Sequence, residues 1–399
     1  MSIGVYYIAS NNVSGSSINQ KNVDTISELK KRSGLDLEFV EIEQLKKVEM
    51  PIVFIGGGGT EGMFLEVFPK LPQPVILLTT GENNSLAASM EILSFLQQQK
   101  VRGEIIHGDL DTMAKRISML YKVFSVKKKI ANAKLGRVGN PSDWLISSSV
   151  DATQSKKETG IEIIDISMQE FFDEIAKEKY EDNQYTKLLK AKNYQPKETE
   201  KALQIYGALK RICLKYKLTG VTVRCFDLLK PVKNTGCVAL AILNAEGVYA
   251  GCEGDVPALI GMMVLGELTG KPIFMANPSR IMTEKDEIIF AHCTLPINMP
   301  TAFRCMTHFE SGLGVALAGD LQLGDLTIFK CSGLMDRYFV TKGELVANLC
   351  ETNLCRTQLE IKLPHDDLSY FLTKSIGNHH LICLGDYVEV VEEFFKWFK

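Results

Sequence analysis

One carboxylate and a group of histidines in the second half of the chain could together hold a metal ion. Five of the six histidines follow residue 291, and three of them, His292, His379 and His380, lie at the ends of apolar runs. These positions are predicted strand termini, where ligand-binding side chains are often found. Together with Glu253, two or three imidazoles suit Mn²⁺, Fe²⁺, Co²⁺ or Zn²⁺. The pattern predicts a divalent metal site, although each histidine alone is also compatible with a structural role.

Glu253 belongs to the stretch CEGDVPALIGMMVLGELTG, which predicts a strand end followed by a helix. Asp255 is a typical N-cap, Pro257 is tolerated in a first turn, and Gly270 is a stop signal. Two interpretations stay open. Asp255 and Glu253 stabilise the helix N-terminus, or Glu253 faces a cleft as a metal ligand or base. Glu253 and Asp255 are therefore the catalytic candidates.

The run IVFIGGGGTEG, residues 52–62, raises the question of a nucleotide site. It lacks the Lys-Ser/Thr ending of a P-loop. It matches G-x-G-x-x-G, but it follows the third predicted strand, and Glu61 would repel a pyrophosphate. The run is more typical of a strand-to-helix turn at the carboxyl edge of a sheet. Thr60 and Glu61 are then either hydrogen-bonding groups for a sugar or parts of a plain turn.

The elements that must position these residues follow from the apolar runs. Residues 1–133 alternate apolar runs at 3–8, 37–42, 52–55, 75–78 and 103–106 with helical segments, which predicts a flavodoxin-like domain. Residues 134–270 predict a second α/β domain, with strands in DWLISSS, IEIIDIS and GVTVRC and a helix break at Pro196. Residues 271–399 carry short alternating runs that predict an antiparallel, β-barrel-like domain with a closing helix over 387–398. The fold class is α/β, with two doubly wound parallel sheets and a β-barrel-like C-terminal domain.

Charge and composition indicate which kinds of partner this protein is not expected to bind. The formal net charge is -3 at pH 7, so nucleic acid is not an expected partner. No apolar run reaches the roughly 18 residues that span a bilayer, so we expect no membrane partner. The N-terminal segment lacks the pattern of a signal peptide, and ten cysteines without a CxxC pair are typical of reduced thiols. These features predict a cytoplasmic protein.

Several stretches resemble the L-fucose/L-arabinose isomerase family, in particular its shorter fucose-isomerase-like members. They are GGTEG, ENNSLAASMEIL, TGCVALAILNAEGVYAGCEGDVPALIGMMVLGELTGKPIFMANP, IIFAHCTLP, THFESGLGVALAGD, NLCRTQLEI and GNHHLICLGDYVEVVEEF. The resemblance implies two flavodoxin-like domains and a β-barrel-like domain, assembled as a homotrimer or homohexamer. It also implies a metal-dependent interconversion of aldoses and ketoses through an enediolate, most often with Mn²⁺. It makes Glu253 and His292 ligands, together with His379 or His380, of which strand alternation directs only one inward.

One position departs from that pattern. The resemblance implies a second acidic residue in FMANPSR, where this chain has Asn277. An amide can coordinate a cation or bind substrate but cannot carry a proton. Either Asp255 or Glu310 then supplies the acid, or the chemistry differs, or activity is lost.

Three further residues are candidates for binding the distal part of a sugar substrate: Arg304, His308 and Arg356. The competing interpretation is that they form surface or interface pairs, because charged strand residues usually face solvent. If they bind an anion, the substrate is an acidic or sulfonated sugar. A non-catalytic sugar-binding protein on the same fold is the other alternative.

Overall fold

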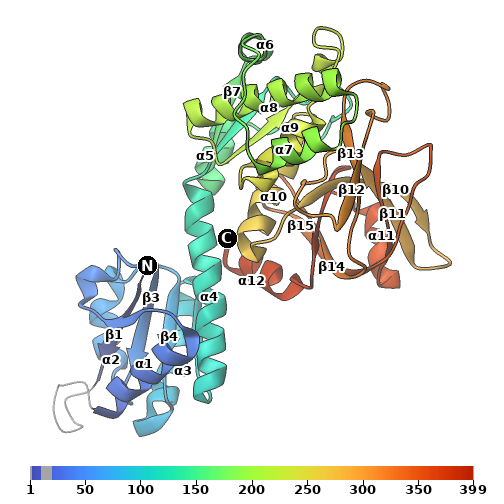
Figure 1. The fold of residues 1–399 in the computed structure, drawn as a ribbon. Helices are drawn as coiled ribbons and strands as arrows, with labels where there is room; N and C mark the ends of the chain where they lie inside the picture. Colours follow the sequence, from blue (N-terminus) through green and yellow to red (C-terminus); the bar gives the residue numbers. More distant parts are fainter. Residues whose placement is uncertain (1, 10–19, 399) are drawn as a thin grey trace. The chain divides into compact units, whose positions relative to one another are not determined.

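A computed structural model describes residues 2–9 and 20–398 of the chain. The chain divides into two compact units, one up to Lys128 and one from Lys129 to Trp397. Helix α4 (Leu110–Ala131) connects them (Figure 1). Each unit is described separately below.

The first unit is built on a five-stranded parallel sheet with the order β2-β1-β3-β4-β5. Its strands are β1 (Ile3–Ile8), β2 (Leu37–Phe39), β3 (Met50–Ile55), β4 (Val75–Leu78) and β5 (Gly103–Ile106). The remaining helices are α1 (Gln20–Ser33), α2 (Glu61–Val67) and α3 (Ser85–Gln98). This strand order is that of flavodoxin-like sheets. Strand β4 is buried along its whole length, as expected for a parallel strand covered on both faces.

The second unit begins with a four-stranded parallel sheet of order β7-β6-β8-β9. Its strands are β6 (Lys134–Val138), β7 (Glu162–Ile166), β8 (Gly220–Val223) and β9 (Tyr249–Cys252). Its helices are α5 (Ala152–Thr159), α6 (Met168–Ile175), α7 (Gln184–Ala191), α8 (Pro196–Tyr216), α9 (Cys237–Ala245) and α10 (Val256–Thr269). Helix α8 begins at Pro196, where the sequence predicted a break.

A closed barrel of order β10-β11-β16-β15-β14-β17 follows, with every strand pair antiparallel. Its strands are β10 (Phe274–Met282), β11 (Glu287–His292), β14 (Gly324–Cys331), β15 (Tyr338–Asn348), β16 (Thr357–Lys362) and β17 (His380–Leu384). Strands β12 (Ala302–Met306) and β13 (Ala316–Asp320) form a separate two-stranded sheet, and α11 (His365–Thr373) and α12 (Val388–Phe398) complete the unit. Alternate residues of each barrel strand, such as Ile288 and Phe290, fill the interior. The predicted fold class is confirmed.

Helix α10 joins the sheet to the barrel within the second unit. It packs against β8 and β9 on one side and against β14 and β17 on the other (Figure 1). Its residues are apolar almost all round, from Val256 to Leu268, and are buried. A helix without a polar face needs apolar neighbours on all sides, and this position provides them. The N-terminus of α10 is therefore fixed where the two substructures meet.

The strand predicted in DWLISSS is wrong. Residues 143–149 form turns, and the first strand of this sheet is β6, just before them. Leu145 and Ser148 donate backbone hydrogen bonds to Ser142 and Leu145, respectively, which closes short turns rather than a ladder. Ile146 is 91% exposed, so the apolar residues of this segment do not indicate a core strand.

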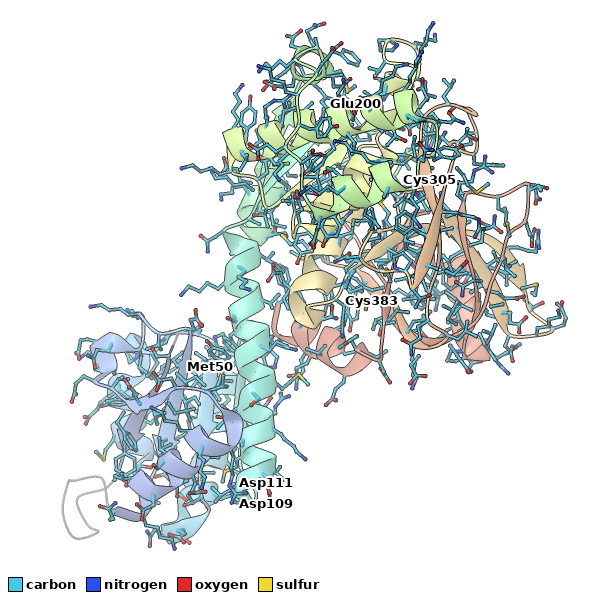
Figure 2. The ribbon with its side chains drawn as sticks, in the orientation of Figure 1. Met50, Asp109, Asp111, Glu200, Cys305 and Cys383 are labelled. Carbon is cyan, nitrogen blue, oxygen red and sulfur yellow. The ribbon has the colours of Figure 1, made fainter. Side chains whose placement is uncertain are left out.

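All ten cysteines are free, and seven of them are buried. Cys383 lies inside β17, and Cys305 lies on β12 (Figure 2). Among the described residues, none of the helices has the length and apolar character needed to cross a membrane.

Candidate active site

The turn between β9 and α10 carries the first group of the site. Glu253 and Gly254 both adopt left-handed backbone conformations, with φ of 63° and 72°. This conformation is unfavourable for glutamate and usually persists only where the surrounding structure enforces it, as at functional sites. Gly254 is required, since a Cβ there would lie 2.7 Å from the carbonyl oxygen of Asn140. The turn holds the Glu253 side chain at the carboxyl end of the parallel sheet.

Two histidines from the barrel meet Glu253. His292 is the last residue of β11, and His379 immediately precedes β17. Oε1 of Glu253 lies 3.9 Å from Nε2 of His292 and 3.6 Å from Nε2 of His379. One ligand atom from each of the three buried residues lies within 4.8 Å of the other two, so the group could hold a metal ion. Ligands at about 2.1 Å from a shared ion would have separations of this size.

Each histidine is oriented through its other ring nitrogen. Nδ1 of His292 is 2.8 Å from Oγ1 of Thr294, and Nδ1 of His379 is 2.8 Å from Oδ2 of Asp255. Such partners fix the tautomer and leave Nε2 free to bind a metal. Nε2 of His379 is buried and has no hydrogen-bond partner among the described residues. A bound cation would satisfy this nitrogen, so the donor set fits a divalent metal.

The electrostatics of the site favour an ionised carboxylate and a neutral His292. Burial works to raise the pKa of Glu253, but the His379 and His292 imidazoles and a hydrogen bond from Trp144 lower that pKa to about 2. Burial and the neighbouring His379 lower the pKa of His292 to about 3. Burial opposes the charge of His379, but Asp255 and Glu253 raise its pKa to about 8. The two carboxylates thus attract positive charge to the point where the three side chains meet.

Asp255 lies behind His379 rather than beside Glu253. It is fully buried, accepts a 2.9 Å hydrogen bond from the backbone N–H of Ala258, and caps α10. Its Oδ2 is also 3.9 Å from Nζ of Lys330. Asp255 thus caps the helix as predicted, while Glu253 faces the two histidines.

His380 points away from the group. Its Nδ1 contacts the carbonyl oxygen of Asn378 at 2.9 Å, and its Nε2 contacts the Tyr370 hydroxyl at 3.1 Å. The ring packs against Phe290 and Phe371 of the barrel interior. Successive residues around a strand point to opposite faces, which separates His379 from His380. The structure brings only His379 to Glu253.

Asn277 lies on β10, beside both strands that lead to the histidines. It pairs with Ala291 of β11, and its neighbour Ala276 pairs with His380. Its Oδ1 accepts a 3.1 Å hydrogen bond from Asn378. The register therefore places Asn277 near the site, bonded to the segment that carries His379.

The loop after β12 contributes His308 and Glu310. His308 is buried, its Nδ1 contacts the Ser311 hydroxyl at 3.0 Å, and its Nε2 is 3.9 Å from Oε2 of Glu310. Burial and the charge of Glu253 raise the pKa of Glu310. Burial and Arg356 lower the pKa of His308.

The other predicted binding residues are spread over the chain. Arg356 donates from Nε to the Thr307 carbonyl at 2.7 Å, and its guanidinium lies over the Phe309 ring. Arg304 is exposed on β12 and approaches Asp320 at 3.8 Å. Thr60 and Glu61 belong to the first unit, whereas His292 and His379 belong to the second. Thr60 is buried and donates to the Gly57 carbonyl at 2.8 Å, which is a turn-stabilising contact.

Sequence reasoning missed three residues that support the site. Trp144 donates from Nε1 to Oε2 of Glu253 at 2.6 Å, and its ring meets the edge of Phe226. Thr294 orients His292. Its position two residues after His292 was the sequence signal that could have identified it. Lys330 is only 1% exposed, and its position inside the apolar run TIFKC was a signal of a buried charge.

Comparisons with known proteins point to sugar isomerases. No family model matches the chain. The chain is 23% identical over 356 residues to proteins named sulfoquinovose isomerase from Priestia megaterium (strain ATCC 12872 / QMB1551) and Priestia aryabhattai, covering 82% of this chain and 79% of each relative. A protein of the same name from Clostridium sp. (strain MSTE9) is 24% identical over 140 residues, or 35% of this chain and 30% of that relative. The similarity to sugar isomerases thus spans most of this chain.

The first prediction concerns the turn that holds Glu253. Gly254→Ala should destabilise the second unit more than Gly247→Ala, because both positions have positive φ but only Gly254 lacks room for a Cβ. We expect a loss of about 1–2 kcal/mol for Gly247→Ala. Gly254→Ala should lose roughly a further 1–3 kcal/mol, because its new Cβ overlaps the Asn140 carbonyl. Urea unfolding of both variants measures the difference, and equal losses would show that the close approach is unimportant.

The second prediction concerns the metal ligands. His379→Gln should weaken Mn²⁺ binding by more than about 100-fold, because loss of a ligand outweighs loss of an outer hydrogen bond. His380→Gln should leave the affinity unchanged. Isothermal titration with Mn²⁺ measures both, with His365→Gln, an exposed histidine paired with Asp286, as the control. Weaker binding in the His380 variant than in the His379 variant would reverse the assignment.

The third prediction separates the two tasks of Asp255. Asn is as good an N-cap as Asp, so Asp255→Asn should keep α10 folded. The amide is a weaker acceptor for the His379 ring, so Mn²⁺ affinity should fall by about 10- to 100-fold. Circular dichroism and Mn²⁺ titration measure the two effects. An unchanged affinity in the folded variant would remove Asp255 from the metal centre.

Proposed function

We propose that this protein is a metal-dependent aldose–ketose isomerase whose substrate carries a sulfonate group. The observation that carries the proposal is the buried group formed by Glu253, His292 and His379, in a chain similar to sulfoquinovose isomerases over most of its length. Sulfonated sugars, one of the alternatives that the sequence left open, are favoured over neutral sugars by the names of these relatives. Mn²⁺ is the proposed metal.

The reaction moves a proton between two adjacent carbons of the sugar. A divalent cation held by Glu253, His292 and His379 would polarise the sugar carbonyl and stabilise the negative charge that develops on its oxygen. The low pKa keeps Glu253 ionised near neutral pH, which suits a ligand of the cation, and we also assign to Glu253 the transfer of the carbon-bound proton. Trp144 holds the second oxygen of this carboxylate and fixes its direction.

A second group must move the hydroxyl proton, and we assign this task to Glu310. Asn277 cannot exchange a proton, and Asp255 is occupied by His379, Lys330 and the helix N-terminus. Glu310 has an exposed side chain beside His308, and its raised pKa suits a group that both donates and accepts protons. Glu310 therefore replaces the acid that Asn277 lacks.

Arg356 is the proposed partner of the sulfonate. Its guanidinium has five N–H donors, and the hydrogen bonds between described residues use two of them, both on Thr307. The remaining donors can form charge-assisted hydrogen bonds to a sulfonate oxygen. His308 and Asn277 would bind hydroxyl groups. The enzyme is proposed to act in the cytoplasm as a homotrimer or homohexamer.

A non-catalytic sugar-binding protein is the second candidate, and Asn277 is the observation that favours it. The two candidates differ in one measurable event. An isomerase exchanges the carbon-bound proton with solvent or forms the ketose, whereas a binding protein does neither.

The fourth prediction tests turnover directly. The Mn²⁺-loaded protein, incubated with sulfoquinovose in D₂O, should form the ketose, observed by NMR together with any deuterium at C1 or C2. Glu253→Gln should abolish turnover. Glu310→Gln should lower kcat by about 100-fold, the size expected for loss of one general acid–base group, with Mn²⁺ affinity unchanged. Full activity of Glu310→Gln would exclude its proposed role.

Substrate discrimination supplies the control. Arg356→Met should raise KM for sulfoquinovose and leave any turnover of glucose unchanged, whereas Arg304→Met should change neither. Saturable binding of sulfoquinovose without ketose or deuterium incorporation would favour the binding protein. Turnover of L-fucose but not of sulfoquinovose would contradict the sulfonated substrate.

A further inference from the structure

Lys330 is a buried cation without a hydrogen-bond partner. It lies on β14 and is 1% exposed, and its Nζ makes no hydrogen bond to any described residue. Among the described residues, its one ion pair is with Asp255, at 3.9 Å. An ammonium group has three N–H donors, and leaving them unpaired in a buried place is unfavourable. A ligand that accepts hydrogen bonds would resolve this.

A cavity of about 230 Å³ lies at Lys330. Small-molecule sites typically measure about 300–1,000 Å³, so this cavity suits a smaller ligand. Its lining is mostly polar and includes the hydroxyls of Ser147, Ser148, Ser332 and Ser375. Ser147 and Arg337 are exposed lining residues, so the cavity has access to solvent.

Arg337 is a second positively charged residue in the lining of this cavity. No hydrogen bond or ion pair of its guanidinium to another described residue is present, whereas its backbone N–H donates to the Ser332 hydroxyl. The nearby carboxylates have other partners, since Asp255 binds His379 and Asp336 accepts from Ser332. Two cations and the hydroxyls of Ser147 and Ser148 around a small space are the chemistry that holds a tetrahedral oxyanion.

The cavity is separate from the proposed sugar site. Glu253, His292 and His379 are not among its lining residues. Lys330 and His379 contact the same oxygen of Asp255, so this carboxylate links the two places.

We infer that the cavity formed by Lys330, Arg337 and the four serines binds a small oxyanion, a sulfate-like or sulfonate group. The oxyanion accepts hydrogen bonds from the Lys330 ammonium, the Arg337 guanidinium and the hydroxyls of Ser147 and Ser148, whereas the hydroxyls of Ser332 and Ser375 already donate to Asp336 and Gly377. None of the residues that line the cavity is assigned a step of the isomerase chemistry.

Isothermal titration of the Mn²⁺-loaded, full-length protein with inorganic sulfate tests the fifth prediction, against a chloride background of equal ionic strength. Arg337→Met should weaken sulfate binding by about tenfold, because it removes one charge-assisted contact at an exposed position. Lys330→Met should abolish binding. Lys285→Met, which removes an exposed lysine from the turn between β10 and β11, is the control of equal charge and should bind as the unaltered protein does.

Two results would overturn the proposal. One is that sulfate does not bind the unaltered protein, and the other is that it binds the Arg337 and Lys330 variants with unchanged affinity. If Lys330→Met does not fold, Arg337→Met alone decides, because its side chain is exposed and forms no hydrogen bond or ion pair with another described residue. A parallel titration with 2-hydroxyethanesulfonate identifies the source of the anion. Tighter binding of this compound indicates an organic sulfonate, and tighter binding of sulfate indicates a free inorganic ion, and either order supports the site.

Discussion

The buried carboxylate of Asp255 is the contact on which the rest of the site depends. It accepts the N–H of Ala258 in the first turn of α10, holds the His379 ring by Nδ1, and lies beside the Lys330 ammonium. Burying an ion is unfavourable unless its oxygens are satisfied, and here each neighbour contributes. Burial opposes ionisation, but Lys330 and His379 lower the pKa of Asp255 to about 2. The helix N-terminus and the orientation of His379 are therefore fixed by one group.

This arrangement explains why the site lies where the parallel sheet and the barrel meet. Glu253 comes from the end of β9, while His292 and His379 come from the barrel strands β11 and β17. Helix α10 packs on both substructures and begins two residues after Glu253. Because protein interiors are densely packed, the helix fixes the position of the parallel sheet relative to the barrel. Side chains at the ends of three different strands can then hold one geometry without a disulfide.

The sequence predicts the architecture well because apolar periodicity is a local property. Buried parallel strands such as β4 appear as continuous apolar runs, and the alternation from Leu359 to Lys362 in β16 marks a barrel wall. The turns at residues 143–149 have a similar apolar sequence but no neighbouring strand. A local sequence pattern does not show whether a neighbouring strand is present. Asp255 could be predicted as a helix cap from its spacing to Pro257. Its contact with His379, 124 residues away, could not.

The left-handed backbone of Glu253 has a consequence for how this chain can change over time. Glycine or asparagine would adopt that conformation with less strain, by about 1–2 kcal/mol in the case of glycine. Random substitution tends to remove strain that no longer serves a purpose. A descendant that had abandoned its chemistry would therefore tend to lose the glutamate at this position first. The glutamate at this position is therefore a sequence marker. It distinguishes relatives that keep this chemistry from relatives that have lost it.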